Sequence, residues 1–431
     1  MKRIYTYIIL SVLLGVSGLG SRTYGQHSET LVQLADGDTI EVLDTAELAD
    51  SADTTFVADS LRLPWPQSVQ TRLARLLEDD MFETSFVGLM VYDLDADSTI
   101  FAHNEKKMMR PASTMKLITA IAALDRLGGN YQFKTELYYT GQVDAGTLTG
   151  DIYCVGGCDP RFNADDLRAF VESIRKMGVD TIRGHIFADK SMKDADRWGK
   201  GWCWDDDNPE LSPLLIGRKD NFTERFRDEL QESGVVVEAT MGEARRPDGA
   251  FNLCRRFHTM DQILMRMMKN SDNLYAESMF YQLAAASGNS RASAKDARQQ
   301  MQRLVQKVGL NPSRYTFADG SGLSLYNYVS AELEVRLLRY AFQNNNIYMH
   351  LHSALPEAGV DGTLKKRMRG AFTRSNVFAK TGTVEGVSAL AGYCTAANGH
   401  RLAFAIINNG VMHQRNGRNF QDRVCTALCQ P

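Results

Sequence analysis

The chain has 431 residues, of which 44% are hydrophobic and 23% are charged, a composition typical of a globular protein long enough to form two domains. It excludes a protein that lies mainly within a membrane. The net charge of −3 and the lack of any basic run or stripe exclude nucleic acid as an expected partner, because nothing would neutralise a row of phosphates.

The start of the chain has the layout of a secretory signal peptide. Two basic residues precede an apolar stretch from Ile8 to Val16, and several glycines follow. The apolar stretch is too short to span a membrane. We therefore predict a signal peptide over residues 1–25, for which cleavage after Gly20 and cleavage after Gly25 both fit.

An acidic segment follows. Residues 27–60 contain nine acidic side chains and no Lys or Arg, which is the composition of a chain that cannot repay its ordering entropy. We expect residues 26–64 to be a flexible leader. The mature protein is then expected to be periplasmic or otherwise exported, without a membrane span.

The first folded elements are expected from Trp65 onward, where apolar residues recur at helical spacing. Residues 86–104 indicate a hairpin, because two β-rich arms are joined by a short polar turn. A second helix is predicted over residues 111–129, where two glycines end it.

This second helix carries Ser113 and Lys116 in the sequence PASTMKLITA. A spacing of three residues places both side chains on one helical face. A serine hydroxyl is a poor nucleophile until a base takes its proton, and a lysine amine that is held neutral can do this. Pro111 indicates the helix start, so Ser113 is expected in the first turn, near the positive end of the dipole. An S-x-x-K match alone also arises by chance in a chain of this length.

Two later segments support the pair. Ser271 and Asn273 lie in KNSDNLYAE between two helical patterns, and Lys380 opens the sequence KTGT just before a β-prone segment. S-x-x-K, S-x-N and K-T-G in this order form the motif set of the penicillin-recognising serine enzymes. Each motif is weak alone, but the ordered set is a strong indication.

The stretch between the first and second motifs differs from the rest of the chain in its pattern of short predicted elements. Residues 132–255 contain short β-like pieces and two helical patterns, and we interpret them as one inserted α/β module. The main domain would then consist of residues 65–131 and 256–431. It resumes with a methionine-rich helical face, read as core, and ends with a hairpin at Asn398-Gly399 and a final helix. The predicted fold class is α+β, an antiparallel sheet built from both chain ends with helices on both faces.

No metal or other cofactor is expected. The eight histidines show no ligand spacing, and we interpret His350 and His352 as a solvated segment. Seven cysteines leave at least one thiol free. Cys154 and Cys158 permit either a small disulfide ring or two buried thiols, whereas Cys425 and Cys429 are too far apart on a helix to bridge.

With these motifs in place, the stretch from about residue 86 to residue 409 resembles the serine D-alanyl-D-alanine carboxypeptidase/endopeptidase family of penicillin-binding proteins. The likeness extends to LTGDIYCVGGCDPRF, GWCWDD, ADGSGLSLYNYVS and LPEAGVDGTLKKR, all in family order. It implies a penicillin-binding transpeptidase/β-lactamase-like domain that carries a module inserted after the nucleophile.

The resemblance implies a role for each motif residue. Ser113 would be the nucleophile and Lys116 its base. Ser271 and Asn273 would relay protons and contact the substrate, and Lys380 would add positive charge beside them.

The resemblance also implies how a substrate binds. A D-Ala-D-Ala peptide would lie along the K-T-G strand, with Gly382 leaving room for its backbone. Thr381 and Thr383 would contact the terminal carboxylate, and the backbone N–H groups of Ser113 and Thr383 would form the oxyanion hole.

Two features depart from the family pattern. The chain has room for one inserted module, whereas many members carry a further nested one. Leu325 follows DGSGLS, where members commonly have an Arg that helps to hold the charged end of the peptide's diamino acid. The side-chain preference is therefore open.

The expected function is that of an exported serine D-Ala-D-Ala carboxypeptidase or endopeptidase that cleaves peptidoglycan stem peptides through an acyl-enzyme and is inhibited by β-lactams. A β-lactamase shares the motifs but is usually a compact single domain, and the 158 positions from Ser113 to Ser271 favour the inserted-module family. The alternative from another class is a catalytically idle penicillin or peptidoglycan binder.

Overall fold

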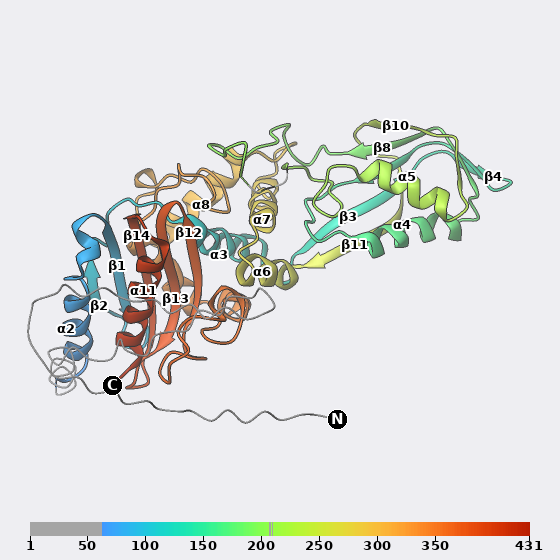
Figure 1. Cartoon of the computed structure of the whole chain (residues 1–431). Coiled ribbons are helices and arrows are strands. Elements are labelled where there is room, and N and C mark those ends of the chain that lie inside the picture. The colour runs from blue at the N-terminus through green and yellow to red at the C-terminus, as the bar shows by residue number, and fades with distance from the viewer. Residues whose placement is uncertain (1–62, 207, 209) are drawn as a thin grey trace, which may run out of the picture. The chain divides into compact units, whose positions relative to one another are not determined.

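The computed structural model describes residues 63–206, 208 and 210–431 (Figure 1). The predicted signal peptide and nearly all of the predicted leader lie outside these residues. Within the described part of the chain, no helix is both long and apolar enough to cross a membrane.

The main sheet joins the two ends of the described chain. Its strand order is β12-β13-β14-β1-β2, and every neighbouring pair is antiparallel. The strands are β1 (Phe86–Asp93), β2 (Ser98–His103), β12 (Phe378–Val384), β13 (Gly386–Thr395) and β14 (Arg401–Val411). Both predicted hairpins, β1–β2 and β13–β14, are confirmed.

Helices cover both faces of this sheet, as predicted (Figure 1). Alternate residues of β14 show the reason, because successive side chains point to opposite faces. Phe404 and Ile406 pack with α2 (Gln67–Leu76) and α11 (Gln414–Cys429). Ala405, between them, packs with the second helical layer.

That second layer contains the middle of the main domain. It comprises α3 (Met115–Leu127), α6 (Met260–Lys269), α7 (Asn273–Ala285), α8 (Ala294–Lys307), α9 (Ala331–Gln343) and α10 (Asn345–Ala354). The main domain also contains the short 3₁₀ turns η1 (Asp80–Glu83), η2 (Ala112–Thr114), η3 (Pro312–Arg314) and η4 (Gly362–Leu364). Helix α6 begins with a capping box between Thr259 and Gln262, and its methionine-rich face is core. Helix α7 is buried on nearly all sides, and such a helix is held by packing rather than by an amphipathic face.

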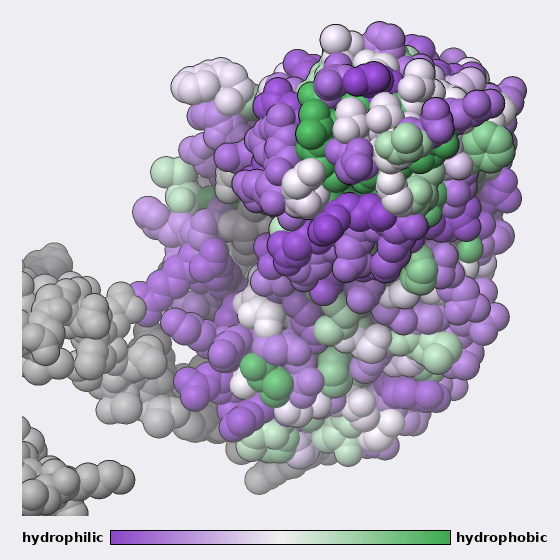
Figure 2. Space-filling model, turned by 90° about the vertical axis from the view of Figure 1, so that its right-hand side faces the viewer, coloured by the Kyte–Doolittle hydropathy of each residue, from purple (hydrophilic) through white to green (hydrophobic). Residues whose placement is uncertain are grey.

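Residues 132–259, which include the segment predicted to be an inserted module, form two small sheets with a hydrophobic core of their own, and we call them the module. One sheet has the order β10-β8-β6-β3-β11 and the other β4-β5-β7-β9. The strands are β3 (Gln132–Tyr139), β4 (Gln142–Asp144), β5 (Thr147–Thr149), β6 (Ile152–Val155), β7 (Thr181–Arg183), β8 (His185–Asp189), β9 (Val236–Val237), β10 (Thr240–Glu243) and β11 (Phe251–Thr259), and the helices are α4 (Ala164–Lys176) and α5 (Phe222–Glu232). The strands that enter and leave the module, β3 and β11, pair with each other. Figure 2 faces the module's side of the molecule and shows a largely hydrophilic surface on which apolar residues form small groups.

Two local interpretations are settled by burial. Cys154 and Cys158 are buried free thiols and do not form a ring. The interpretation of His350 and His352 as a solvated segment is wrong, because both are half-buried on α10. His350 contacts Asp261 at 2.5 Å, and the His352 ring lies tilted against Phe378 with ring centroids 4.4 Å apart. No group of side chains suited to a metal ion occurs among the described residues.

Candidate active site

Ser113 lies in the 3₁₀ turn η2, directly before α3, and not in the first α-helical turn that the sequence suggested. The reason is Ala112, whose φ of +48° is left-handed and incompatible with an α-helix. Gly322 accommodates this turn, since a Cβ there would lie 1.8 Å from the Ala112 carbonyl oxygen. Ser113 is thus presented by a strained turn that another loop holds in place.

Lys116, one turn further on, is fully buried and holds three uncharged groups. Its Nζ lies 2.8 Å from each of Ser113 Oγ, Asn273 Oδ1 and the carbonyl oxygen of Ser321. Burial lowers the Lys116 pKa to about 8, although nearby acids led by Asp319 oppose the shift. The amine therefore gains a substantial neutral fraction in slightly alkaline solution, in direct contact with the serine.

Ser271 and Lys380 form a second contact beside the first. Lys380 Nζ donates to Ser271 Oγ at 2.8 Å and to the Thr381 carbonyl oxygen at 2.7 Å. Burial, followed by the charge of Lys116, holds the Lys380 pKa well below its usual value. The charge of Lys116 therefore disfavours a second ammonium group at Lys380.

The K-T-G segment forms β12, the strand at one edge of the main sheet. Gly382 faces the nucleophile's turn, because a Cβ there would lie 2.6 Å from the Pro111 carbonyl oxygen and 3.1 Å from the Thr114 nitrogen. This packing requires a glycine, which adds a second reason to the substrate approach inferred from sequence. Thr381 Oγ1 bonds Thr363 Oγ1 at 2.8 Å, and Thr383 is exposed.

Buried acids support the site, and the motifs did not reveal them. Glu277 accepts hydrogen bonds from the backbone N–H groups of Gly320 and Ser321, which fixes the carbonyl that Lys116 contacts. Glu334 accepts from Thr114 Oγ1 at 2.5 Å. Burial raises the pKa of each carboxyl to about 8. The available sequence signals were the acid inside YAES and the segment DGSGLS, neither of which names its partner.

Four hydrogen bonds tie the module to the Asp319 loop and to the segment that carries Ser271 and Asn273. Trp202 Nε1 donates to Asp319 at 2.8 Å, and Ser324 Oγ donates to the Lys200 carbonyl at 2.7 Å. Arg218 bonds both oxygens of Asp272, the residue between Ser271 and Asn273. Module and motif segments are therefore joined at the site.

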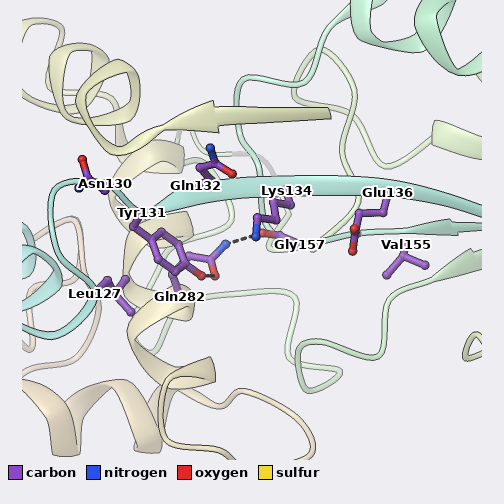
Figure 3. Close-up of a pocket in the computed structure, with 10 residues that line it drawn as sticks. Leu127, Asn130, Tyr131, Gln132, Lys134, Glu136, Val155, Gly157 and Gln282 are labelled. Atoms are coloured by element: carbon purple, nitrogen blue, oxygen red, sulfur yellow. Dashed lines mark hydrogen bonds between the residues drawn. The ribbon is translucent and has the colours of Figure 1, made fainter. Parts of the chain in front are cut away.

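A separate cavity of about 440 Å³ lies at the far end of α3 and α7 (Figure 3). Tyr131 donates to Gln282 at 2.7 Å there, and the Gln282 amide reaches the Gly157 carbonyl. Leu127, in its lining, stands eleven residues after Lys116 on α3, or about 16 Å along the axis. This cavity is not part of the nucleophile's surroundings.

Comparisons with known proteins agree with this geometry. The sequence model described as the D-Ala-D-Ala carboxypeptidase 3 (S13) family matches residues 69–214 and 217–430. A D-alanyl-D-alanine carboxypeptidase from Actinomadura sp. (strain R39) is 28% identical over 436 residues, which cover 78% of this chain and 80% of that protein.

Solved structures share the fold. Penicillin-binding protein 4 (DacB) from Haemophilus influenzae, 23% identical, matches with a TM-score of 0.77 over 83% of this chain and 99% of its own, and it has also been solved with a β-lactam. A predatory peptidoglycan endopeptidase from Bdellovibrio bacteriovorus, 16% identical, matches with a TM-score of 0.51 over 75% of this chain and 86% of its own.

Proposed function

The chain belongs to the D-Ala-D-Ala carboxypeptidase 3 (S13) family of serine-type carboxypeptidases, and from this premise we propose that it is exported and cleaves the D-Ala-D-X bond of peptidoglycan stem peptides, through an acyl-enzyme on Ser113. The observation that carries the proposal is the 2.8 Å contact between Ser113 Oγ and a buried lysine amine whose pKa is lowered. Such a pair is an activated nucleophile.

Acylation begins when neutral Lys116 takes the proton of Ser113. The serine oxygen attacks the carbonyl carbon of the penultimate D-Ala, and the oxyanion is stabilised by the backbone N–H groups of Ser113 and Thr383. As the C–N bond breaks, the amine of the departing D-residue receives a proton. The hydrogen-bonded pair Ser271–Lys380 lies beside the site and supplies a route for that proton.

Substrate is held along β12. An extended peptide adds to the free edge of this strand, and Thr381 and Thr383 meet its terminal carboxylate. Asn273 already gives its Oδ1 to Lys116, so its amide N–H₂ group remains for a substrate carbonyl. Water then hydrolyses the ester and frees Ser113.

The same site could instead belong to an idle binder of penicillin or peptidoglycan. That alternative is disfavoured because each of the five proposed catalytic side chains, Ser113, Lys116, Ser271, Asn273 and Lys380, makes a hydrogen bond to another of them. An idle protein has no requirement for this arrangement.

Purified muropeptides test the proposal and separate its two activities. Mass analysis after incubation should show loss of terminal D-Ala, cleavage of cross-links, or both, and none of these with Ser113→Ala. Wild-type protein that binds a β-lactam covalently but leaves every muropeptide intact would favour the idle binder. Mass analysis of the N-terminus of secreted protein tests export, with cleavage expected after Gly20 or Gly25.

A further inference from the structure

Three of the chain's four tryptophans lie within seven residues, in the module sequence WGKGWCW. Trp202 is anchored, but Trp198 is 53% exposed and Trp204 is 96% exposed. Tyr326, on the loop that follows DGSGLS, is 54% exposed. Large aromatic side chains held this open to solvent mark an interaction site more often than a packing surface.

These aromatic residues belong to one surface. A Cβ on Gly201 would lie 2.4 Å from a carbon of the Tyr326 ring, so the ring lies directly against the Gly201 backbone. Trp198 and Trp204 are each three residues from Gly201, which limits their backbones to about 11 Å from it. We call Trp198, Trp204 and Tyr326 the aromatic rim.

The rim is fixed next to the proposed catalytic residues. Trp202 and Ser324 fasten the two loops together through hydrogen bonds to Asp319 and to the Lys200 carbonyl. The Asp319 loop continues into Ser321, whose carbonyl accepts from Lys116. Tyr326 of the rim therefore lies on the loop that contacts Lys116, five residues after Ser321.

We propose that the aromatic rim binds N-acetylated sugar rings of the glycan strand from which the stem peptide extends. The inference rests on the proposed function, because only a peptidoglycan substrate brings sugar and scissile peptide to the enzyme together. The C–H face of a pyranose ring is apolar and its edge is polar, and rigid aromatic rings flanked by polar groups match both. Lys200 and Asp205, between and beside the tryptophans, are exposed and can meet the sugar's hydroxyl and amide groups.

A bilayer surface is the competing occupant. Interfacial tryptophans usually accompany a basic, amphipathic helix. Here they lie in a non-helical loop that continues into acidic residues, with Asp206 accepting from the Cys203 N–H at 2.7 Å. Negative charge on this loop opposes binding to anionic lipid, which favours the neutral sugar.

Binding is tested on the full exported chain carrying Ser113→Ala, with chitotetraose as the sugar probe. Saturable binding heat is expected in calorimetric titration, and it should be lost in the double variant Trp198→Ala/Trp204→Ala and retained in Trp204→Phe. Phe251→Ala, which removes an aromatic side chain of the module that is 60% exposed, is the matched control and should bind normally. Binding that persists in the double variant, or no binding by the parent chain, would overturn the proposal, as would rim-dependent binding to phosphatidylethanolamine/phosphatidylglycerol vesicles without sugar binding.

Kinetics then distinguish the rim from the catalytic residues. The ratio of kcat/KM for a disaccharide-linked stem peptide to that for the free peptide should fall about tenfold in the double variant and stay constant in Phe251→Ala. If the double variant turns over both peptides with an unchanged ratio, the sugar-binding proposal for the rim is refuted but the proposed function is not. Failure of wild type to turn over either peptide refutes the proposed function instead.

Discussion

Two buried lysines, one in the catalytic domain and one in the module, show what burial does with and without a counter-ion. Lys193 of the module has a side chain 1% exposed, and it meets the Asp194 carboxylate at 2.8 Å and the Tyr281 ring at 4.6 Å. Lys116 is equally buried, but its three partners are uncharged. A buried lysine beside a carboxylate forms an ion pair that serves the structure. A buried lysine without an adjacent anion is driven toward its neutral amine form. Of these two lysines, we propose Lys116 as the base.

The largest effect is expected from the nucleophile that this base contacts. Ser113→Ala should abolish acylation by penicillin, because no ester can form without the hydroxyl. Intact-protein mass spectrometry measures the adduct, and Ser353→Ala, an exposed serine on α10, is the control. An adduct that persists in Ser113→Ala would place the nucleophile elsewhere.

Substituting Lys116 and Lys193 in turn tests the comparison between them directly. Lys116→Ala should slow acylation by about 10²–10⁴-fold, the usual contribution of general-base help. Lys193→Met should leave the acylation rate unchanged and lower the melting temperature, because Asp194 loses its partner. Stopped-flow acylation and thermal melts measure the two effects. Activity of Lys116→Ala within threefold of wild type would show that Lys116 is not the base.

The pH dependence sharpens the same comparison. The Lys116 pKa is lowered from 10.5 to about 8, and the reactive form is the neutral amine, so acylation should accelerate as pH rises through about 8. Between pH 7 and pH 9 the rate should increase about tenfold and then level off. A rate that continues to climb toward pH 10.5 would mean that the lysine is not desolvated in the working enzyme.

Hydrophobic periodicity, turn signals and motif order in the sequence predicted the main-sheet hairpins and the residues of the candidate site. The Asn398-Gly399 turn predicted the hairpin that β13 and β14 form, and the three motifs identified residues that the structure brings together. The sequence did not predict that Ser321 would offer its carbonyl to Lys116, or that Glu277 would hold that turn. The first contact joins residues that are 205 positions apart in the sequence, and the second joins residues that are 44 positions apart. No local sequence pattern specifies either contact.

The sequence also carried no indication of the backbone strain at Ala112. Ala112 is an ordinary helix former, so its left-handed φ could not be read from PASTMK, and the first helical turn was misplaced. Tertiary packing of Gly322 against the Ala112 carbonyl overrides the local preference. The strained residue precedes the nucleophile, where such strain is expected.

A fourth test removes most of the module and keeps the ends of β3 and β11 that border the main domain. Residues Glu136 and Arg255 pair across β3 and β11, so a two-residue turn can join them and replace residues 137–254. We expect β-lactam acylation to persist and turnover of cross-linked peptidoglycan to change severalfold, because the module contributes both tryptophans of the rim and the contact from Arg218 to Asp272. A cooperative thermal melt confirms that the variant is folded. A folded variant that handles both substrates as wild type does would show that the module has no part in substrate choice.

The smallest effect is expected at Leu325, where family members commonly carry Arg. The side chain is 37% exposed on the loop between Ser324 and Tyr326, and it cannot replace the paired hydrogen bonds of a guanidinium to a carboxylate. We therefore expect kcat/KM for a stem peptide with a free diamino-acid carboxylate to exceed that for its amidated form by less than about a hundredfold, or 2.7 kcal/mol. Leu325→Arg should raise this ratio, because it restores the charge without touching the serine or its base, and Leu325→Met is the neutral control. A ratio above about a hundredfold in wild type would mean that another cation, an Arg or Lys of the module, already holds the carboxylate. In that case Leu325→Arg would change the ratio little.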